Sequence, residues 1–153
     1  MPNYWLMKCE PCAYSIDDLR KNKTSMWEGV RNYQARNFMR DQMKKGDIAF
    51  FYHSNAKPSG IVGLMEVVKE SYPDHTAFDP NSKYFDPKST QEKPTWFMVD
   101  VQFLKKFPNT ISLSDLREIK NLKDMMVLKK GSRLSIQPVK EVEFKTIMEK
   151  YGY

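Results

Sequence analysis

Hydrophobic and polar positions along this chain cluster or alternate in short stretches, which predicts short strands and short helices. Strands are expected at residues 4–7, 48–52, 61–69, 96–104 and 134–139, and helices at 15–20, 33–44, 112–116 and 142–150. Ser15 and Asn32 are the expected N-caps of the first two helices. Because the elements do not alternate regularly, an α+β domain is predicted. The short aromatic-rich strands favour a small twisted β-barrel with peripheral short helices over an open parallel sheet.

One domain spanning residues 1–153 is the expected organisation, because this length is typical of a single compact domain. Residues 71–94 interrupt the pattern, since they are polar, rich in proline and poor in the aliphatic side chains that a core element needs. Loops of this length without regular structure are often functional. We therefore expect a long loop with a functional role at residues 71–94.

The composition provides enough apolar residues for one core and a moderate excess of positive charge. Hydrophobic residues make up 41% of the sequence, and 25 Lys and Arg against 19 Asp and Glu give a net charge of +6. This balance is compatible with nucleic-acid or nucleotide binding and equally with a solubilising surface. The sequence lacks a run of about 18 apolar residues, which argues against a membrane span. Its first residues also lack the pattern of a secretory signal, so a cytoplasmic protein is the expectation.

Signatures of catalysis and of metal binding are weak in this sequence. The P-loop, G-x-S-x-G, H-E-x-x-H and dinucleotide-binding motifs are not found. Cys9 and Cys12 have C-x-x-C spacing, but a zinc site needs four ligands, and His53 and His75 do not form a partner pair. We therefore expect no metal, no cofactor and no catalytic residues. His53 follows a predicted strand, where it would cap the strand, line a pocket or act as a general base.

Residues 27–38, with the sequence WEGVRNYQARNF, combine aromatic rings, guanidinium groups, amides and a glycine. Neither a core nor a solvated helix needs this mixture, whereas a pocket that stacks a flat polar ring and hydrogen-bonds its edge does. In such a pocket Trp27 and Tyr33 would supply ring faces. Arg31 and Arg36 would contact phosphate. The groups that would read the base edge belong to Asn32, Gln34, Ser54 and Asn55.

Plainer explanations exist for several of these residues taken singly. Trp27 would serve as a core residue, and Asn32 only as a helix N-cap. Arg36 would occupy a solvated helix position. The pocket interpretation depends on the co-occurrence of all these residue types in one short segment.

Segments distributed over nearly the whole chain match a known family in the same order. They are YWLMK at residues 4–8 with Glu10 and Pro11, SIDDL at 15–19, WEGVRNYQARNF at 27–38, FFYHSN at 50–55, GIVGL at 60–64, YPD at 72–74, WFMVDV at 96–101 and RLSIQP at 133–138. With these segments the chain resembles the EVE domain family of the PUA-like superfamily. The resemblance implies a PUA-like fold, a small β-barrel with peripheral helices, and neither a metal nor an organic cofactor.

The resemblance also implies a pocket between residues 27–34, the strand end at 53–55 and the first strand. It implies a reader of modified bases such as methylated or oxidised cytosine. The residues expected to bind the base are Trp5, Trp27, Asn32, Tyr33, Gln34, His53, Ser54 and Asn55, and those expected to bind phosphate are Lys8, Arg31 and Arg36.

Three functions are compatible with these observations. The first is a monomeric module that binds DNA or RNA by flipping a modified base into the aromatic pocket. The second is a nucleotide- or nucleic-acid-processing enzyme that uses the same pocket, with His53 as its base. The third is a protein-interaction domain whose contact surface is the loop at residues 71–94. We expect the first.

Overall fold

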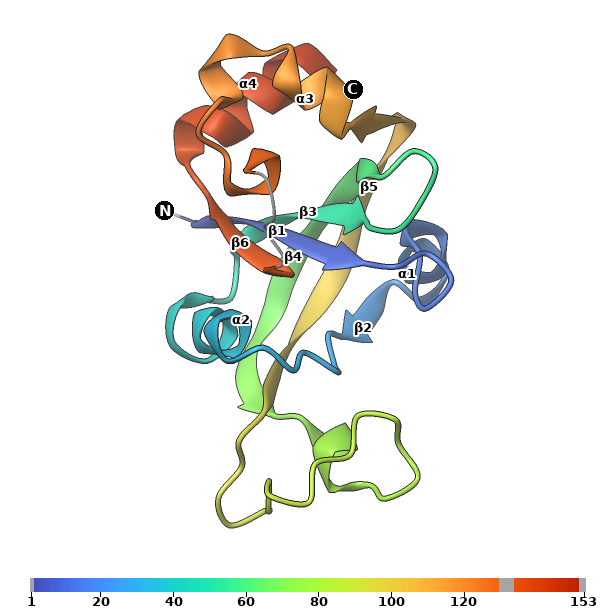
Figure 1. Cartoon of the computed structure of the whole chain (residues 1–153), viewed down its shortest axis with the longest axis vertical. Helices are drawn as coiled ribbons and strands as arrows, with labels where there is room; N and C mark the ends of the chain where they lie inside the picture. Colours follow the sequence, from blue (N-terminus) through green and yellow to red (C-terminus); the bar gives the residue numbers. More distant parts are fainter. Residues whose placement is uncertain (1, 130–133, 152–153) are drawn as a thin grey trace.

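The computed structural model describes residues 2–129 and 134–151, and within them six strands form one mixed sheet. The order across the sheet is β2-β5-β4-β3-β1-β6 (Figure 1). The strands are β1 (Tyr4–Cys9), β2 (Thr24–Met26), β3 (Ile48–His53), β4 (Gly60–Pro73), β5 (Phe97–Ser112) and β6 (Ile136–Val139). β1 and β3 run parallel, and the other neighbours run antiparallel. The predicted α+β class is confirmed. The pairings of the described residues do not include one between β2 and β6, so a closed barrel stays a prediction.

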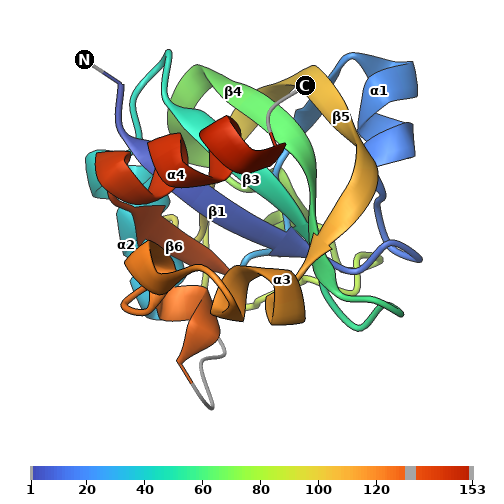
Figure 2. The same ribbon diagram turned by 90° about the horizontal axis from the view of Figure 1, so that it is seen from above.

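Short helices flank this sheet. They are α1 (Ile16–Asn22), α2 (Tyr33–Asn37), α3 (Leu113–Arg117) and α4 (Glu141–Tyr151), and the π-helical turn η1 (Phe38–Gln42) continues α2. Short 3₁₀ segments are η2 (His75–Phe78), η3 (Lys120–Leu122) and η4 (Met126–Leu128). Figure 1 shows α3 and α4 at one end of the molecule and the segment around η2 at the other. Viewed from above, α4 lies across the sheet (Figure 2).

The two predicted helix caps are confirmed. Ser15 and Asp18 form a capping box at the start of α1, in which each side chain bonds the backbone N–H of the other residue. The side chain of Asn32 accepts a hydrogen bond of 2.9 Å from the backbone N–H of Ala35 at the start of α2. These short-range hydrogen bonds fix where α1 and α2 begin.

Alternation along the strands divides the core into two layers. Trp5 and Met7 of β1 and Phe51 of β3 belong to one buried cluster, which packs against α1 and α2. Leu6 and Phe50, the intervening residues, belong to a second cluster that includes side chains of α3 and α4. Because successive side chains of a strand point to opposite faces, both faces of the central strands are covered. Figures 1 and 2 agree on this arrangement, with α4 and α1 on different sides.

Several predicted boundaries are wrong. β4 continues to residue 73 and β5 to residue 112, so both extend beyond the predicted strands at 61–69 and 96–104. The predicted helix at 33–44 consists of a short α-helix and a π-helical turn that ends at Gln42. β2 was not expected at all, because its sequence Thr24-Ser25-Met26 has no apolar pattern. In each strand, pairing with a neighbour supplies the backbone hydrogen bonds that the local pattern does not indicate.

Candidate nucleic-acid interface

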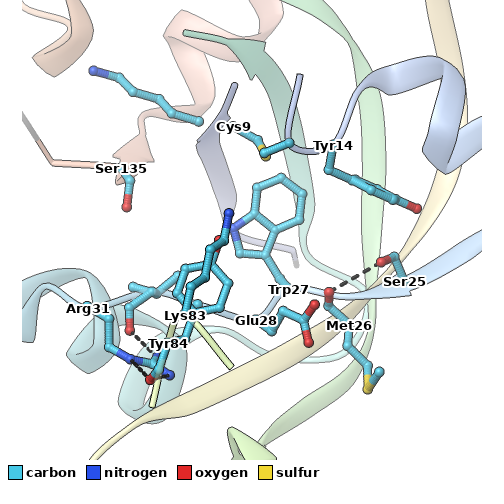
Figure 3. Close-up of a pocket in the computed structure, with 14 residues that line it drawn as sticks. Cys9, Tyr14, Ser25, Met26, Trp27, Glu28, Arg31, Lys83, Tyr84 and Ser135 are labelled. Atoms are coloured by element: carbon cyan, nitrogen blue, oxygen red, sulfur yellow. Dashed lines mark hydrogen bonds between the residues drawn. The ribbon is translucent and has the colours of Figure 1, made fainter. Parts of the chain in front are cut away.

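A cavity of about 360 Å³ opens beside Trp27, where segments distant in sequence meet (Figure 3). Its walls come from the end of β1, the turn before α1, β2 and the residues that follow it, the segment after η2, and the residue that precedes β6. The lining residues are Lys8, Cys9, Ala13, Tyr14, Ser25, Met26, Trp27, Glu28, Gly29, Val30, Arg31, Lys83, Tyr84 and Ser135.

Trp27 forms the inner wall of this cavity. Its backbone N–H donates to the carbonyl of Val99 at 2.8 Å, which extends the pairing of β2 with β5 by one residue. Its ring meets Phe51 edge-on, with 5.4 Å between ring centroids and an interplanar angle of 81°, and only 6% of the residue is exposed. In the described part of the chain the indole N–H donates to no protein acceptor. Trp27 is therefore both a core residue and a cavity residue, with a hydrogen-bond donor left for a ligand.

Tyr84 forms a second aromatic wall. Figure 3 shows it with Lys83 and Arg31 on one side of Trp27, while Tyr14 lies on the other. The Tyr84 carbonyl accepts two hydrogen bonds from the guanidinium of Arg31, at 3.1 Å from Nε and 2.8 Å from Nη2. Because Tyr84 belongs to the segment predicted as a long loop, that loop forms part of the cavity wall.

Asp74 anchors this segment to the residues after β2. Its carboxylate is fully buried and accepts hydrogen bonds from the backbone N–H of Gly29 (2.8 Å), from Nη1 of Arg31 (3.0 Å) and from the backbone N–H of Thr76 (2.9 Å). Burial alone would raise the pKa of Asp74, but the hydrogen bonds from Thr76, Gly29 and Arg31 outweigh it and hold this pKa below its ordinary value. A charged carboxylate therefore holds the two walls together.

Arg31 and Arg36, both expected to bind phosphate, differ in how many N–H groups they have left. The five N–H groups of Arg31 donate to the carbonyls of Tyr84 and Val30 and to the side chains of Asp74 and Thr76. Arg36 makes three hydrogen bonds, two to the side-chain oxygen of Asn37 and one to the Thr95 carbonyl. Two of its five N–H groups have no partner in residues 2–129 and 134–151.

Three of the predicted site residues, Lys8, Trp27 and Arg31, line the cavity. Lys8 is half-buried, its ammonium lies 5.6 Å from the ring centroid of Tyr52, and burial lowers the pKa of its ammonium group. Lys83, which lines the cavity from the opposite segment, is exposed. The lining therefore includes two lysines that make no ion pair in the described residues, but the ammonium of Lys8 lies over Tyr52, a residue of the second core cluster, so Lys83 is the lysine better placed to meet a ligand of the cavity.

The structure places the other predicted base-binding residues outside the lining of this cavity. Trp5 is buried in the core, where its indole N–H donates to Oδ2 of Asp47 at 2.9 Å. Asn32 caps α2, and Gln34 is exposed on that helix. Tyr33 is 61% exposed and stacks on Trp96. Their expected roles in binding a base stay predictions.

The strand end at residues 53–55 connects to neighbouring turns. Nε2 of His53 accepts the backbone N–H of Ile16 at 3.1 Å, which caps the first turn of α1, and burial lowers the pKa of the imidazole. Asn55 donates from its side chain to the carboxylate of Glu10, and the backbone N–H of Ser54 donates to the carbonyl of Cys9. These bonds stabilise one edge of the turn that leads into the cavity.

Sequence reasoning missed Tyr14, Lys83, Tyr84 and Ser135. The one signal that pointed to two of them was the length and polarity of residues 71–94. Ser135 reaches the cavity through its carbonyl, which accepts the backbone N–H of Lys8, and Tyr14 through the turn that follows β1, where its N–H donates to the carbonyl of Glu10. No local pattern indicates that these two residues meet. Within the described residues, no group of three His, Cys, Asp or Glu side chains could hold a metal, and no helix is long and apolar enough to cross a membrane.

Comparisons with known proteins identify relatives over almost the full length. The family model described as EVE domain matches residues 3–150. Human thymocyte nuclear protein 1 is 44% identical, over 97% of this chain and 73% of that protein. A hypothetical protein from Leishmania major has a TM-score of 0.93 at 49% identity, over 98% of this chain and 94% of its own. The crystal structure of human THYN1 protein in complex with 5-methylcytosine-containing DNA has a TM-score of 0.89 at 46% identity, over 97% and 96% of the two chains.

Proposed function

Since the chain belongs to the EVE domain family, we propose that it binds DNA carrying a modified cytosine, with the base held in the cavity beside Trp27. The observation that carries the proposal is the similarity to human THYN1 protein, which was crystallised with 5-methylcytosine-containing DNA. The cavity supports it, because an aromatic wall with an available N–H donor suits a flat base with polar edges.

The chemistry of the cavity assigns different tasks to its walls. Trp27 and Tyr84 offer aromatic surface to the faces of a base that has left the stack. Lys83, which is exposed beside the cavity, attracts a phosphate next to that base. One methyl group in a fitted pocket contributes only about 1–3 kcal/mol of discrimination. Contacts to the phosphate backbone must therefore provide much of the total affinity.

The test compares three duplexes that differ only in one base: cytosine, 5-methylcytosine or 5-hydroxymethylcytosine. We expect tighter binding to a modified duplex, and Trp27→Ala abolishes the preference. The same strands as RNA and as single strands define which polymer is bound. Equal, weak binding to all three duplexes, unchanged by Trp27→Ala, would overturn the proposal.

Phosphate contact is tested separately through the salt dependence of binding. Lys83→Gln is expected to reduce the slope of log K against log salt by about one contact. Lys88→Gln is the matched control, because Lys88 is an exposed lysine of the same segment that is not among the lining residues. Equal slopes for the two variants would exclude Lys83 from the phosphate contacts.

A processing enzyme is the alternative that the sequence left open, with His53 as its base. Nε2, the imidazole nitrogen that would take a proton, already accepts the backbone N–H of Ile16. In the described part of the structure, His53 does not line the cavity. This geometry favours binding without turnover. Incubation of a 5-methylcytosine duplex with the protein, followed by mass spectrometry of the strands, tests it, and any product would favour the enzyme.

A further inference from the structure

Tyr33 presents an exposed aromatic ring that is supported from beneath. It is 61% exposed, and its ring stacks on Trp96 with 4.9 Å between centroids and an interplanar angle of 23°. Trp96 is itself 5% exposed, and its indole N–H donates to Asp86 at 2.7 Å. A buried, hydrogen-bonded tryptophan therefore fixes the orientation of the tyrosine ring, which is preorganised for a further planar group.

The guanidinium of Arg36 contacts both rings of this stack. Its guanidinium carbon is 5.0 Å from the ring centroid of Tyr33 and 5.8 Å from that of Trp96. A position above the outer face of Tyr33 would be farther than this from Trp96, because the Tyr33 ring would lie between them. Together with the 61% exposure of Tyr33, this leaves the outer face of its ring open to solvent, with the guanidinium of Arg36 5.0 Å from the ring centroid.

The same guanidinium retains donors for an anion. Its hydrogen bonds to Thr95 and Asn37 hold it in place and use three N–H groups, which leaves two without a partner in the described part of the chain. An open aromatic face next to an oriented guanidinium has the chemistry that holds one nucleotide, since the ring stacks on the base and the N–H groups bind the phosphate.

A short series of contacts connects this platform to the cavity. Trp96 contacts the guanidinium of Arg31 at 5.3 Å from the ring centroid, and that guanidinium lies 5.5 Å from the ring centroid of Tyr84, a cavity wall. Tyr33 and the cavity are thus separated by two side chains, a span that one strand crosses within a few nucleotides.

We propose that Tyr33 and Arg36 form a second nucleotide subsite, separate from the cavity, which stacks an unpaired base near the modified one and binds its phosphate. The proposal rests on the proposed function, because it assumes a strand whose modified base occupies the cavity. It predicts that the protein contacts two unstacked nucleotides of the same strand, and that single-stranded or locally opened DNA binds better than a closed duplex.

The experiment uses single strands with a central 5-methylcytosine in which one nearby base at a time is replaced by an abasic site. For the wild-type protein, removal of the base that stacks on Tyr33 is expected to weaken binding about 5- to 100-fold. Tyr33→Ala is expected to weaken binding of the intact strand by the same factor and to remove the penalty of that abasic site. Tyr33→Phe keeps the ring and is expected to bind like the wild type.

The phosphate contact has its own matched pair of variants. Arg36→Gln is expected to reduce the salt slope by about one contact. Arg40→Gln is the control, because Arg40 is an exposed arginine nearby that is already paired with Asp41. If the salt dependence of Arg36→Gln has the same slope as that of the wild type, Arg36 does not bind a phosphate and this part of the subsite is overturned.

The outcomes separate the subsite from the function on which it rests. If Tyr33→Ala binds the intact strand as tightly as the wild type and keeps the preference for 5-methylcytosine, only the subsite is overturned. The subsite is also overturned if the losses of binding free energy caused by Tyr33→Ala and by the abasic site add together in the combined experiment. Additive losses would mean that the two changes act at different places. A wild-type protein that binds the modified and unmodified strands equally contradicts the proposed function itself.

Discussion

The ring of Tyr84 lies so close to the α-carbon of Gly29 that a larger side chain does not fit between them. A β-carbon added at Gly29 would lie 2.5 Å from Cζ of Tyr84, and Gly29 has φ of +83°. Position 29 therefore requires glycine for two reasons: its backbone is left-handed, and the ring of Tyr84 leaves no room for a side chain. Through this contact the segment after η2 closes against the residues that follow β2.

Gly29→Ala is expected to move Tyr84 out of the cavity wall and to reduce affinity for a 5-methylcytosine strand. The positive φ alone costs about 1–2 kcal/mol in the free energy of unfolding, and the contact with the ring adds to it. Urea unfolding measures the first effect, and a binding titration measures the second.

Gly46→Ala isolates the backbone contribution. Gly46 has φ of +97°, and a β-carbon there meets nothing within 4 Å. We expect a comparable loss of stability from the left-handed backbone, with no loss of affinity. Equal losses of affinity in the two alanine variants would contradict a role for the contact between Gly29 and Tyr84.

Asp74→Asn is expected to weaken the contacts that hold the two walls of the cavity together. The buried carboxylate accepts from the backbone of Gly29 and pairs with Arg31, so an amide would present N–H groups to donors and leave the guanidinium without its counter-charge. Hydrogen bonds to charged groups contribute about 1.5–3 kcal/mol each, and a loss of that order is expected in urea unfolding. Asp41→Asn, which removes an exposed partner of Arg40, should leave stability unchanged.

The sequence predicted those parts of the fold whose causes are local. Short continuous apolar runs located the buried centres of β1 and β3, and side chains that bond nearby backbone groups located the starts of α1 and α2. The second half of β5 was missed because its polar residues are held by pairing with β4, whose register shifts several times along the hairpin. Such pairing leaves no periodic signal in either strand.

For the candidate site too, the sequence predicted the residues whose signal is local and missed those that depend on distant contacts. Trp27 was found because its segment has an unusual composition, and the structure places it in the cavity. Arg31 was found for the same reason, but its partner Asp74 is 43 residues away, so its structural role was not visible in the sequence. Tyr84 was missed because its place depends on that same distant pairing. His53 was read as a site residue, whereas its observed partner is the first turn of α1.

The stability of the protein is expected to fall as the pH drops below about 6.5, the ordinary pKa of histidine. Burial lowers the pKa of His53 in the folded state, so the unfolded chain binds its proton first as the pH falls. The contribution of His53 is complete above the unfolded pKa and is lost as the pH falls through the folded one. Urea unfolding at a series of pH values between 7.5 and 4.5, chosen to bracket that pKa, measures it.

His53→Gln provides the comparison for this pH series, because a glutamine side chain keeps an acceptor for the N–H of Ile16 without a group that titrates there. Its stability should change less than that of the wild type between neutral and mildly acidic pH. A variant that follows the wild-type curve would assign the pH dependence to other groups. Reduced affinity for a modified strand at neutral pH would instead support the predicted role of His53 in binding the base.

Trp5 and Trp27 are expected to respond in opposite ways to replacement by phenylalanine. Trp5→Phe removes the hydrogen bond to buried Asp47, and the loss of one partner of a buried carboxylate is expected to cost about 1–3 kcal/mol of unfolding free energy. Its preference for 5-methylcytosine should not change, since Trp5 lies outside the cavity lining.

Trp27→Phe keeps an aromatic ring against Phe51 but loses the indole N–H, so its preference should fall with a smaller loss of stability. Urea unfolding and paired titrations with modified and unmodified strands measure both effects. A folded Trp5→Phe protein that loses the preference would restore Trp5 to the base-binding residues.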